Sequence, residues 1–153
     1  MPELLIREAH EDDLPALIAM FAEDDLGGHG DTTDAAALPD YRAAFHHIAG
    51  SPYETLYVAE LDGKVAGTFQ IALTRSLTGR GGKSLIIEAV QTRSDLRGHG
   101  IGGKMVAYAI DEAKRLDCRL VQLMSNAKRL DAHRFYERLG FSPSHLGFKM
   151  KLK

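Results

Sequence analysis

A glycine-rich turn between an apolar run and an amphipathic helix is the feature that most constrains how this chain can fold. Residues 85–90 predict a buried strand, and apolar side chains recur at helical spacing through 101–116. The turn and helix start between them comprise Arg97, Gly98, His99, Gly100, Ile101, Gly102 and Gly103. The first N–H groups of a helix lack intrahelical partners and carry partial positive charge, and glycines let an anion approach them. The sequence therefore predicts a site for a phosphorylated cofactor.

Two common phosphate motifs fit this turn poorly. Gly98-x-Gly100-x-x-Gly103 matches the dinucleotide fingerprint, but the next expected strand, 119–124, ends without the acidic residue that would hold a ribose. The nucleotide P-loop would need Ser or Thr after Lys104 to bind magnesium, and Met105 stands there. The glycines therefore indicate another class of cofactor.

A third pattern fits better. Arg97-x-x-Gly100-x-Gly102 resembles the pyrophosphate-binding signature of the GNAT superfamily of acetyl-CoA-dependent N-acetyltransferases, which reads Arg or Gln, two residues, Gly, one residue, then Gly or Ala. Further along, Asn126 and the Phe-Tyr-Glu-Arg-Leu-Gly-Phe run at 135–141 resemble the family's second signature. The resemblance is strongest over 85–141. It implies acetyl-CoA as co-substrate.

The order of expected elements agrees with that resemblance. Patterns predict strands at 4–9, 55–61, 64–73, 84–92 and 119–124, with a final strand near 148–152, and helices at 12–26, 40–49, 100–116 and 128–139. Asp62-Gly63 is a strong hairpin signal. We expect one α+β domain spanning 1–153, with a mixed, mostly antiparallel sheet flanked by helices on both faces.

Two residues are candidates for the chemistry of acetyl transfer, which needs a base for the amine and a proton donor for the thiolate. Glu88 lies in an apolar strand, where desolvation would raise its pKa, and it is the candidate base; alternatively it faces solvent or pairs with an arginine. Tyr136 matches the tyrosine that the family places near the CoA sulfur, although an aromatic on a helix is often plain core.

The resemblance also implies cofactor contacts. Family members typically carry a bulge before the glycine turn, where backbone groups of Val90, Gln91 and Thr92 would bind the pantetheine arm. Asn126 would bind pantetheine or cap the following helix, Arg97 would contact the pyrophosphate or simply be a basic turn residue, and Arg134 would reach the 3′-phosphate or remain solvated.

The acceptor is the least defined part of the prediction. Five acids at the end of the first expected helix and in the loop after it favour a cationic amine, or form an ordinary solvated helix end and loop; these are Glu23, Asp24, Asp25, Asp31 and Asp34. Arg75 and Arg80 could instead bind a carboxylate. We expect a small-molecule primary amine, such as an amino acid or a polyamine-like compound. The alternative is a non-catalytic acetyl-CoA-binding sensor or interaction module.

Composition argues against several other classes. A net charge of −2 provides no field to attract nucleic acid or an anionic membrane, and no apolar run is long enough to span a bilayer. The first residues lack a signal peptide pattern, so we expect a cytoplasmic protein. Cys118 is the single cysteine, and the 7 histidines show no zinc-like spacing, so no metal is expected. Because family members often dimerise, the resemblance is compatible with a homodimer.

Overall fold

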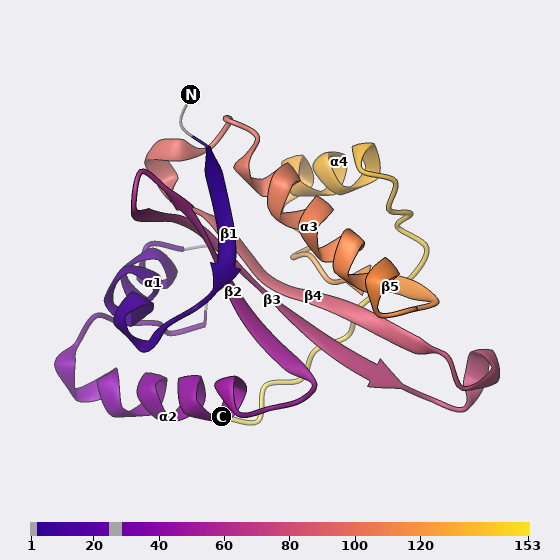
Figure 1. Cartoon of the computed structure of the whole chain (residues 1–153), viewed down its shortest axis with the longest axis horizontal. Helices are drawn as coiled ribbons and strands as arrows, with labels where there is room; N and C mark the ends of the chain where they lie inside the picture. The colour runs from indigo at the N-terminus through magenta and orange to yellow at the C-terminus, as the bar shows by residue number, and fades with distance from the viewer. Residues whose placement is uncertain (1–2, 25–28) are drawn as a thin grey trace.

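A twisted five-stranded sheet forms the centre of the computed structural model, which describes residues 3–24 and 29–153 (Figure 1). The strands lie side by side in chain order: β1 (Leu4–Glu8), β2 (Glu54–Leu61), β3 (Lys64–Arg75), β4 (Lys83–Thr92) and β5 (Leu120–Leu123). The first four are antiparallel, and β4 and β5 are parallel. The predicted mixed, mostly antiparallel sheet is confirmed.

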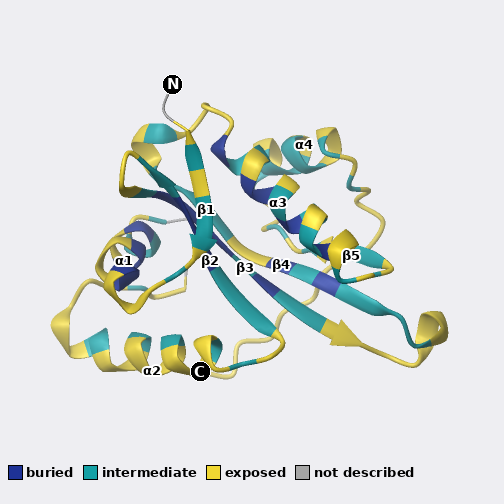
Figure 2. Ribbon diagram, viewed as in Figure 1, coloured by how far each residue is buried: buried dark blue, intermediate teal, exposed yellow. Residues whose placement is uncertain are grey.

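Helices cover both faces of this sheet, as expected. They are α1 (Leu14–Ala22), α2 (Leu38–Ala49), α3 (Ile101–Arg115) and α4 (Leu130–Arg138). Figure 2 shows dark, buried positions on α1, on α3 and along the middle strands. Met105 and Val106 of α3 are fully buried and pack in one cluster with Phe69 of β3 and Leu85 of β4. Since side chains alternate along a strand, Thr68 faces the opposite layer, which α1 covers.

Loops and ends account for the differences from the predicted boundaries. Asp62 and Gly63 both have positive φ, at 52° and 75°, which is the conformation that a two-residue hairpin turn requires. The predicted strand near 148–152 is wrong, because the described residues 142–153 form neither strand nor helix. No described strand lies beside this segment to complete a ladder. None of the described helices is both long and apolar enough to cross a bilayer.

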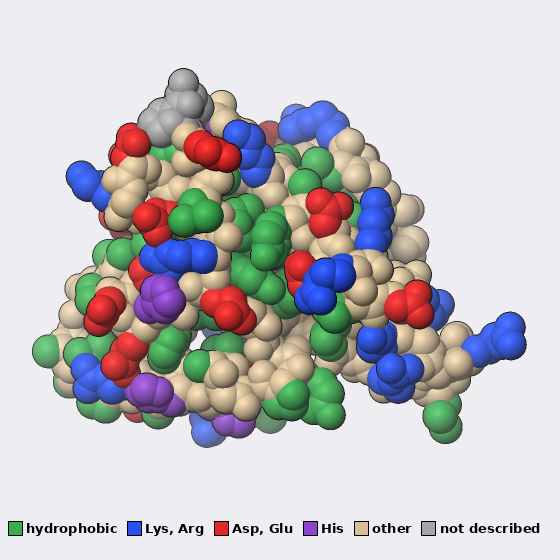
Figure 3. Space-filling view, in the orientation of Figure 1, with side chains coloured by type: hydrophobic (Ala, Val, Ile, Leu, Met, Phe, Trp, Pro, Cys, Tyr) green, Lys and Arg blue, Asp and Glu red, His purple; other side chains and the backbone are tan. Residues whose placement is uncertain are grey.

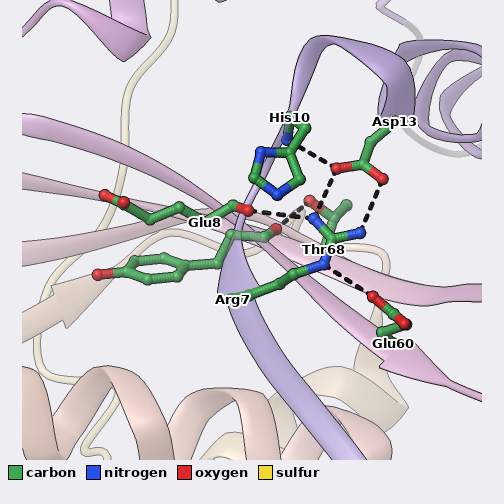
Figure 4. Close-up of polar contacts among 7 residues, drawn as sticks. Arg7, Glu8, His10, Asp13, Glu60 and Thr68 are labelled. Atoms are coloured by element: carbon green, nitrogen blue, oxygen red, sulfur yellow. Dashed lines mark hydrogen bonds and ion pairs between the residues drawn. The ribbon is translucent and has the colours of Figure 1, made fainter. Parts of the chain in front are cut away.

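A half-buried ion-pair network connects the start of α1 to the first two strands (Figure 4). Arg7 of β1 donates to both carboxylate oxygens of Asp13, at 2.8 and 3.0 Å, and to Glu60 of β2 at 2.7 Å. The backbone N–H of His10 also donates to Asp13, at 2.7 Å. Asp13 is only 9% exposed. The network therefore fixes where α1 begins, and so where its other end meets β4.

Candidate active site

β4 carries the expected bulge just before the glycine turn. Thr68 pairs with Gln91 and Gln70 pairs with Glu88, so two residues of β4 lie opposite the single Phe69. The inserted residue, Ala89, has φ of 53°, in the left-handed region. One extra residue also inverts the alternation of side chains along the strand. Leu85 and Ile87 face α3 before the bulge, and Val90 packs against the same core after it.

Beyond Ile87 and Leu123 the two parallel strands no longer pair. Residues 88–92 of β4 continue without a strand on their β5 side. Apart from the pairing with β3, these residues form no backbone hydrogen bond within the described chain. N–H and C=O groups on that side are therefore available to an extended ligand, in the way that a missing strand would use them. This stretch includes Val90, Gln91 and Thr92, the three predicted pantetheine contacts.

The side chains of this stretch have separate roles. Gln91 donates from Nε2 to the backbone carbonyl of Met20 at 2.7 Å, which ties the end of α1 to β4. Val90 and Thr92 are half-buried. Glu88 is exposed, so the expected desolvation is not provided by the chain. Two local features explain this exposure. β5 ends opposite Ile87, and Glu88 lies before the bulge, whose reversal of the side-chain alternation would turn a side chain toward α3.

The glycine turn brings open backbone N–H groups to the end of β4. Gly98 and Gly100 have φ of 83° and 82°, and a Cβ at either position would have open space around it, so conformation and not crowding requires glycine there. His99 holds the turn by its Nδ1, which lies 3.1 Å from the carbonyl oxygens of Leu96 and Arg97. This arrangement sets the direction in which α3 begins.

No side chain among the described residues caps the N-terminus of α3, so the N–H groups of Ile101, Gly102 and Gly103 remain available to an anion. Arg97 is exposed, and its guanidinium has no partner among the residues that the structure describes. A glycine-lined helix start beside an unpaired guanidinium fits a pyrophosphate.

Tyr136 lies on the face of α4 that packs toward the core. Its ring centroid is 5.1 Å from that of Phe135 and 6.0 Å from that of Phe141. Phe135 in turn lies against Gly102, with 3.4 Å from its Cζ to the position that a Cβ would take there. This contact places α4 directly beside the glycine turn. The candidate acid and the candidate pyrophosphate site are thus brought together by one helix contact.

Burial raises the pKa of Tyr136, and the positive charge of Arg129 partly opposes that shift. The hydroxyl therefore stays protonated near neutral pH and is a hydrogen-bond donor. Full proton transfer from a phenol, with a pKa of about 10 or higher, to a thiolate with a pKa of about 8.5 is unfavourable. Tyr136 is accordingly suited to donating a hydrogen bond to a departing sulfur, with transfer occurring only in concert with bond cleavage.

Asn126 and Arg134 lie on the α4 side of the site. Oδ1 of Asn126 accepts from the backbone N–H of Lys128 at 2.9 Å, which closes a local turn. The predicted helix cap is wrong, because the N-cap of α4 is Arg129 and no side chain of the described residues caps it. Arg134 is exposed, and its closest carboxylate is Asp131 at 3.6 Å. A surface pair at that distance leaves Arg134 available to a phosphate.

The acidic segment is largely engaged in internal contacts. Asp24 accepts two hydrogen bonds of 2.8 Å from Arg129, Asp31 accepts from the hydroxyl of Tyr41 at 2.7 Å, and Asp34 accepts from the backbone N–H of Ala36 at 3.1 Å. Oε2 of Glu23 lies 3.4 Å from a serine hydroxyl. Asp25 lies outside the described residues. Acidic, basic and histidine side chains also alternate over α1 and α2 in Figure 3.

The two arginines predicted as carboxylate ligands lie far from Glu88. Arg75 ends β3, and its Nη1 donates to the carbonyl oxygen of Gly81 within the β3–β4 tip. Glu88 pairs with Gln70, so the strand separates it from Arg75 by about 17 Å. Arg80 lies in the same exposed tip. Both arginines therefore lie at the hairpin tip, away from the bulge at which Glu88 lies.

Arg129 is the site residue that the sequence did not indicate. It joins the start of α4 to the end of α1 through Asp24, and its charge acts on Tyr136. Its partner lies 105 positions away in the chain, and no local pattern marks such a pair. Among the described residues no group of three or more His, Cys, Asp or Glu side chains could hold a metal ion.

Comparison with known proteins identifies the family. The model of the acetyltransferase (GNAT) family matches residues 14–141, which include the bulge, the glycine turn and both signatures. The chain belongs to the GNAT acetyltransferase family. The resemblance in the sequence and the predicted fold class are both confirmed.

Individual GNAT relatives differ in how much of the chain they cover. A crystal structure of a transcriptional regulator from Bacillus halodurans C-125 is 39% identical, with a TM-score of 0.94 over 98% of this chain and 100% of that one. An aminoalkylphosphonate N-acetyltransferase of Salmonella typhimurium is 44% identical over 57 residues, which is 37% of each protein. A predicted acetyltransferase from Clostridium acetobutylicum, solved with acetyl-CoA, has 19% identity and a TM-score of 0.73 over 98% of this chain and 97% of that one.

Proposed function

We propose that this protein transfers the acetyl group of acetyl-CoA to the primary amine of a small molecule, within a ternary complex. The observation that carries the proposal is the bulged, half-unpaired end of β4 leading directly into the open N-terminus of α3. Membership of the GNAT family supports the reaction class. The curated relative supports the acceptor class, and aminoalkylphosphonates are the first acceptors to test.

One group of residues would bind acetyl-CoA, and another would transfer protons. Bound at the site, acetyl-CoA supplies the activated acetyl thioester. The N–H groups of Ile101, Gly102 and Gly103, with Arg97, would hold its pyrophosphate, and the unpaired side of residues 88–92 would hold the pantetheine arm. A backbone N–H beside Ala89, freed from the ladder by the bulge, would stabilise negative charge on the acetyl oxygen.

Glu88 and Tyr136 would handle the protons. An alkylamine with a pKa of about 10.4 must lose a proton before it can attack, and Glu88 lies at the bulge to accept it. Because Glu88 is exposed, we assign it transfer through a water molecule. The hydroxyl of Tyr136 would donate a hydrogen bond to the sulfur as the carbon–sulfur bond breaks.

Thiol release from acetyl-CoA, followed against a panel of amines, tests the proposal. The panel contains aminoalkylphosphonates, amino acids and polyamines. Acceptor-dependent release should fall at least about tenfold in kcat in Glu88→Gln and in Tyr136→Phe, with affinity for acetyl-CoA nearly unchanged. Glu137→Gln, an exposed neighbour on α4, is the matched control. Failure of calorimetry to detect acetyl-CoA binding, with NAD and ATP titrated in parallel, would overturn the proposal.

A second candidate is a non-catalytic sensor that binds acetyl-CoA, and it is supported by the 39% identity to the Bacillus halodurans protein described as a transcriptional regulator. Such a sensor would bind acetyl-CoA but release no thiol with any amine. It would also be insensitive to Glu88→Gln. The same two assays therefore separate the candidates.

A further inference from the structure

The guanidinium of Arg129 has more hydrogen-bonding capacity than its internal partner uses. An arginine commonly offers two nitrogens to a carboxylate, but here Nη2 alone donates to both carboxylate oxygens of Asp24, each at 2.8 Å. Nε and Nη1 have no partner among residues 3–24 and 29–153. The side chains of Arg129 and Asp24 are 32% and 21% exposed, so solvent reaches the pair. A second anion can therefore bind beside Asp24 or take its place.

Arg129 lies where the two parallel strands separate. β5 last pairs through Leu123, opposite Ile87. In the turn that follows, the carbonyl oxygen of Asn126 accepts from the backbone N–H of Arg129 at 3.0 Å. Ligands of open sheets bind outside the carboxyl ends of parallel strands. Arg129 therefore lies at the opening beside residues 88–92, where the acetyl group of acetyl-CoA would be held.

Contacts on two sides hold the guanidinium near the proposed reacting groups. Asp24 follows α1, and that end of α1 is tied to the bulged strand by the 2.7 Å hydrogen bond from Gln91 to the carbonyl of Met20. On the other side, α4 begins directly after Arg129 and carries Tyr136, and the charge of Arg129 opposes the rise in the pKa of Tyr136 that burial causes. Figure 1 shows α1 and α4 on the two sides of the sheet, so the ion pair joins these sides around the end of β5.

We propose that Arg129 binds the anionic group of the acceptor, so that the preferred substrate is a small amine carrying an oxyanion a few bonds from its nitrogen. This role of Arg129 rests on the proposed function. The oxyanion would use the N–H groups that Asp24 leaves open, and it would share the guanidinium with Asp24 or displace it. Asp24 is then an internal competitor, which lowers the affinity for the acceptor in proportion to its occupancy of the guanidinium.

Specificity toward matched amines tests this role. Thiol release is followed with aminoethylphosphonate, with β-alanine and with propylamine, which is similar in length but has no anion. Arg129→Gln should lower kcat/KM for an anionic amine at least about tenfold, the contribution of one hydrogen bond to a charged group, and change the value for propylamine much less. Arg138→Gln, at the exposed end of the same helix, is the matched control and should leave all three values unchanged. An equal loss with all three amines would make Arg129 a structural residue and overturn the proposal.

Asp24→Asn is the sharper test, because competition and structural support predict opposite results. Removal of the competing charge should lower the KM for the anionic amine at least about threefold and leave the KM for propylamine unchanged. If the ion pair only holds the end of α1 against the start of α4, the substitution should impair every acceptor, as Arg129→Gln would. A KM for the anionic amines that stays the same or rises in Asp24→Asn would contradict the proposal.

Calorimetry distinguishes a failure of this role from a failure of the proposed reaction. With excess CoA present, aminoethylphosphonate or β-alanine should bind the full chain at least about tenfold more tightly than propylamine, and Arg129→Gln should abolish the difference. These titrations need no turnover, so an absence of thiol release with every amine would overturn the proposed reaction alone. Equal affinity of the unmodified chain for all three compounds would overturn the role of Arg129.

Discussion

Replacing Asp13 with Asn is expected to lower stability by an amount that the geometry of its ion pair allows to be worked out. The substitution removes the charge and turns one of two acceptor oxygens into a donor that faces the guanidinium of Arg7. Hydrogen bonds to charged groups contribute about 1.5–3 kcal/mol, and an uncompensated buried charge costs about 3–5 kcal/mol. Arg7 keeps Glu60 as a partner at 2.7 Å, so the loss stays below that upper range.

We therefore expect Asp13→Asn to reduce the free energy of unfolding by about 2–3 kcal/mol, which corresponds to a fall of about 5–10 °C in Tm for a chain of this size. Urea unfolding monitored by circular dichroism measures the change directly. Asp12→Asn is the matched control, because Asp12 is exposed, adjacent and carries the same charge. Its effect should be within about 0.5 kcal/mol.

The difference between the two forms should depend on pH in one direction. Burial alone would raise the pKa of Asp13, but the hydrogen bonds from Arg7 and from the backbone of His10, with the attraction of the guanidinium, hold it below its usual value. A carboxyl with a lowered folded-state pKa adds stability above its unfolded pKa of about 3.9 and loses it as pH falls through the folded value. The gap between wild type and Asp13→Asn should thus be full at pH 7 and shrink below about pH 4. A gap that is equal at both pH values, or an equal loss in Asp12→Asn, would refute the reasoning.

Three further predictions concern the site and the packing beneath it. Gly100→Ala forces an alanine to φ of 82°, which costs about 1–2 kcal/mol of conformational free energy, and it should raise the KM for acetyl-CoA several-fold. Gly63→Ala is the control: with φ of 75° in the β2–β3 turn, it should lower stability and leave that KM unchanged. Because burial raises the pKa of Tyr136 above its usual value of about 10, any fall in activity between pH 8 and 10 should persist in Tyr136→Phe; its disappearance would contradict that direction. Gly67→Ala would place a Cβ 2.9 Å from Sδ and Cε of the buried Met105, so it should destabilise the fold by about 1–3 kcal/mol, with denaturation curves showing partial recovery when Met105→Ala is added.

Local signals in the sequence predicted the elements that depend on local chemistry. Asp62-Gly63 indicated its hairpin because few other dipeptides accept positive φ at both positions. The glycine turn and the start of α3 were predictable for the same reason, because the turn requires residues that accept positive φ. The match to the family placed the bulge correctly. These features depend on neighbouring residues, so a single chain is enough to predict them.

Features that depend on distant partners were not predictable in the same way. The exposure of Glu88 depends on where β5 ends, and the pairing of Asp24 with Arg129 joins segments 105 positions apart. The alternation at 146–153 has the period of a strand, but a pattern in the sequence does not say whether a partner strand exists to pair with it. Pattern alone therefore predicted a strand where the structure has none.

The tip of the β3–β4 hairpin separates two sections of the chain that share one core. Residues 74–80 at its tip are exposed, and Leu77 is 95% exposed. One section carries β1 to β3 with α1 and α2, and the other carries β4, β5, α3 and α4. Trypsin should cut first at Arg80, and the long ladder between β3 and β4 should keep the nicked halves together. Expressed as separate fragments fused to two interacting proteins, the halves should reassemble, which would make this fold a scaffold for a split reporter.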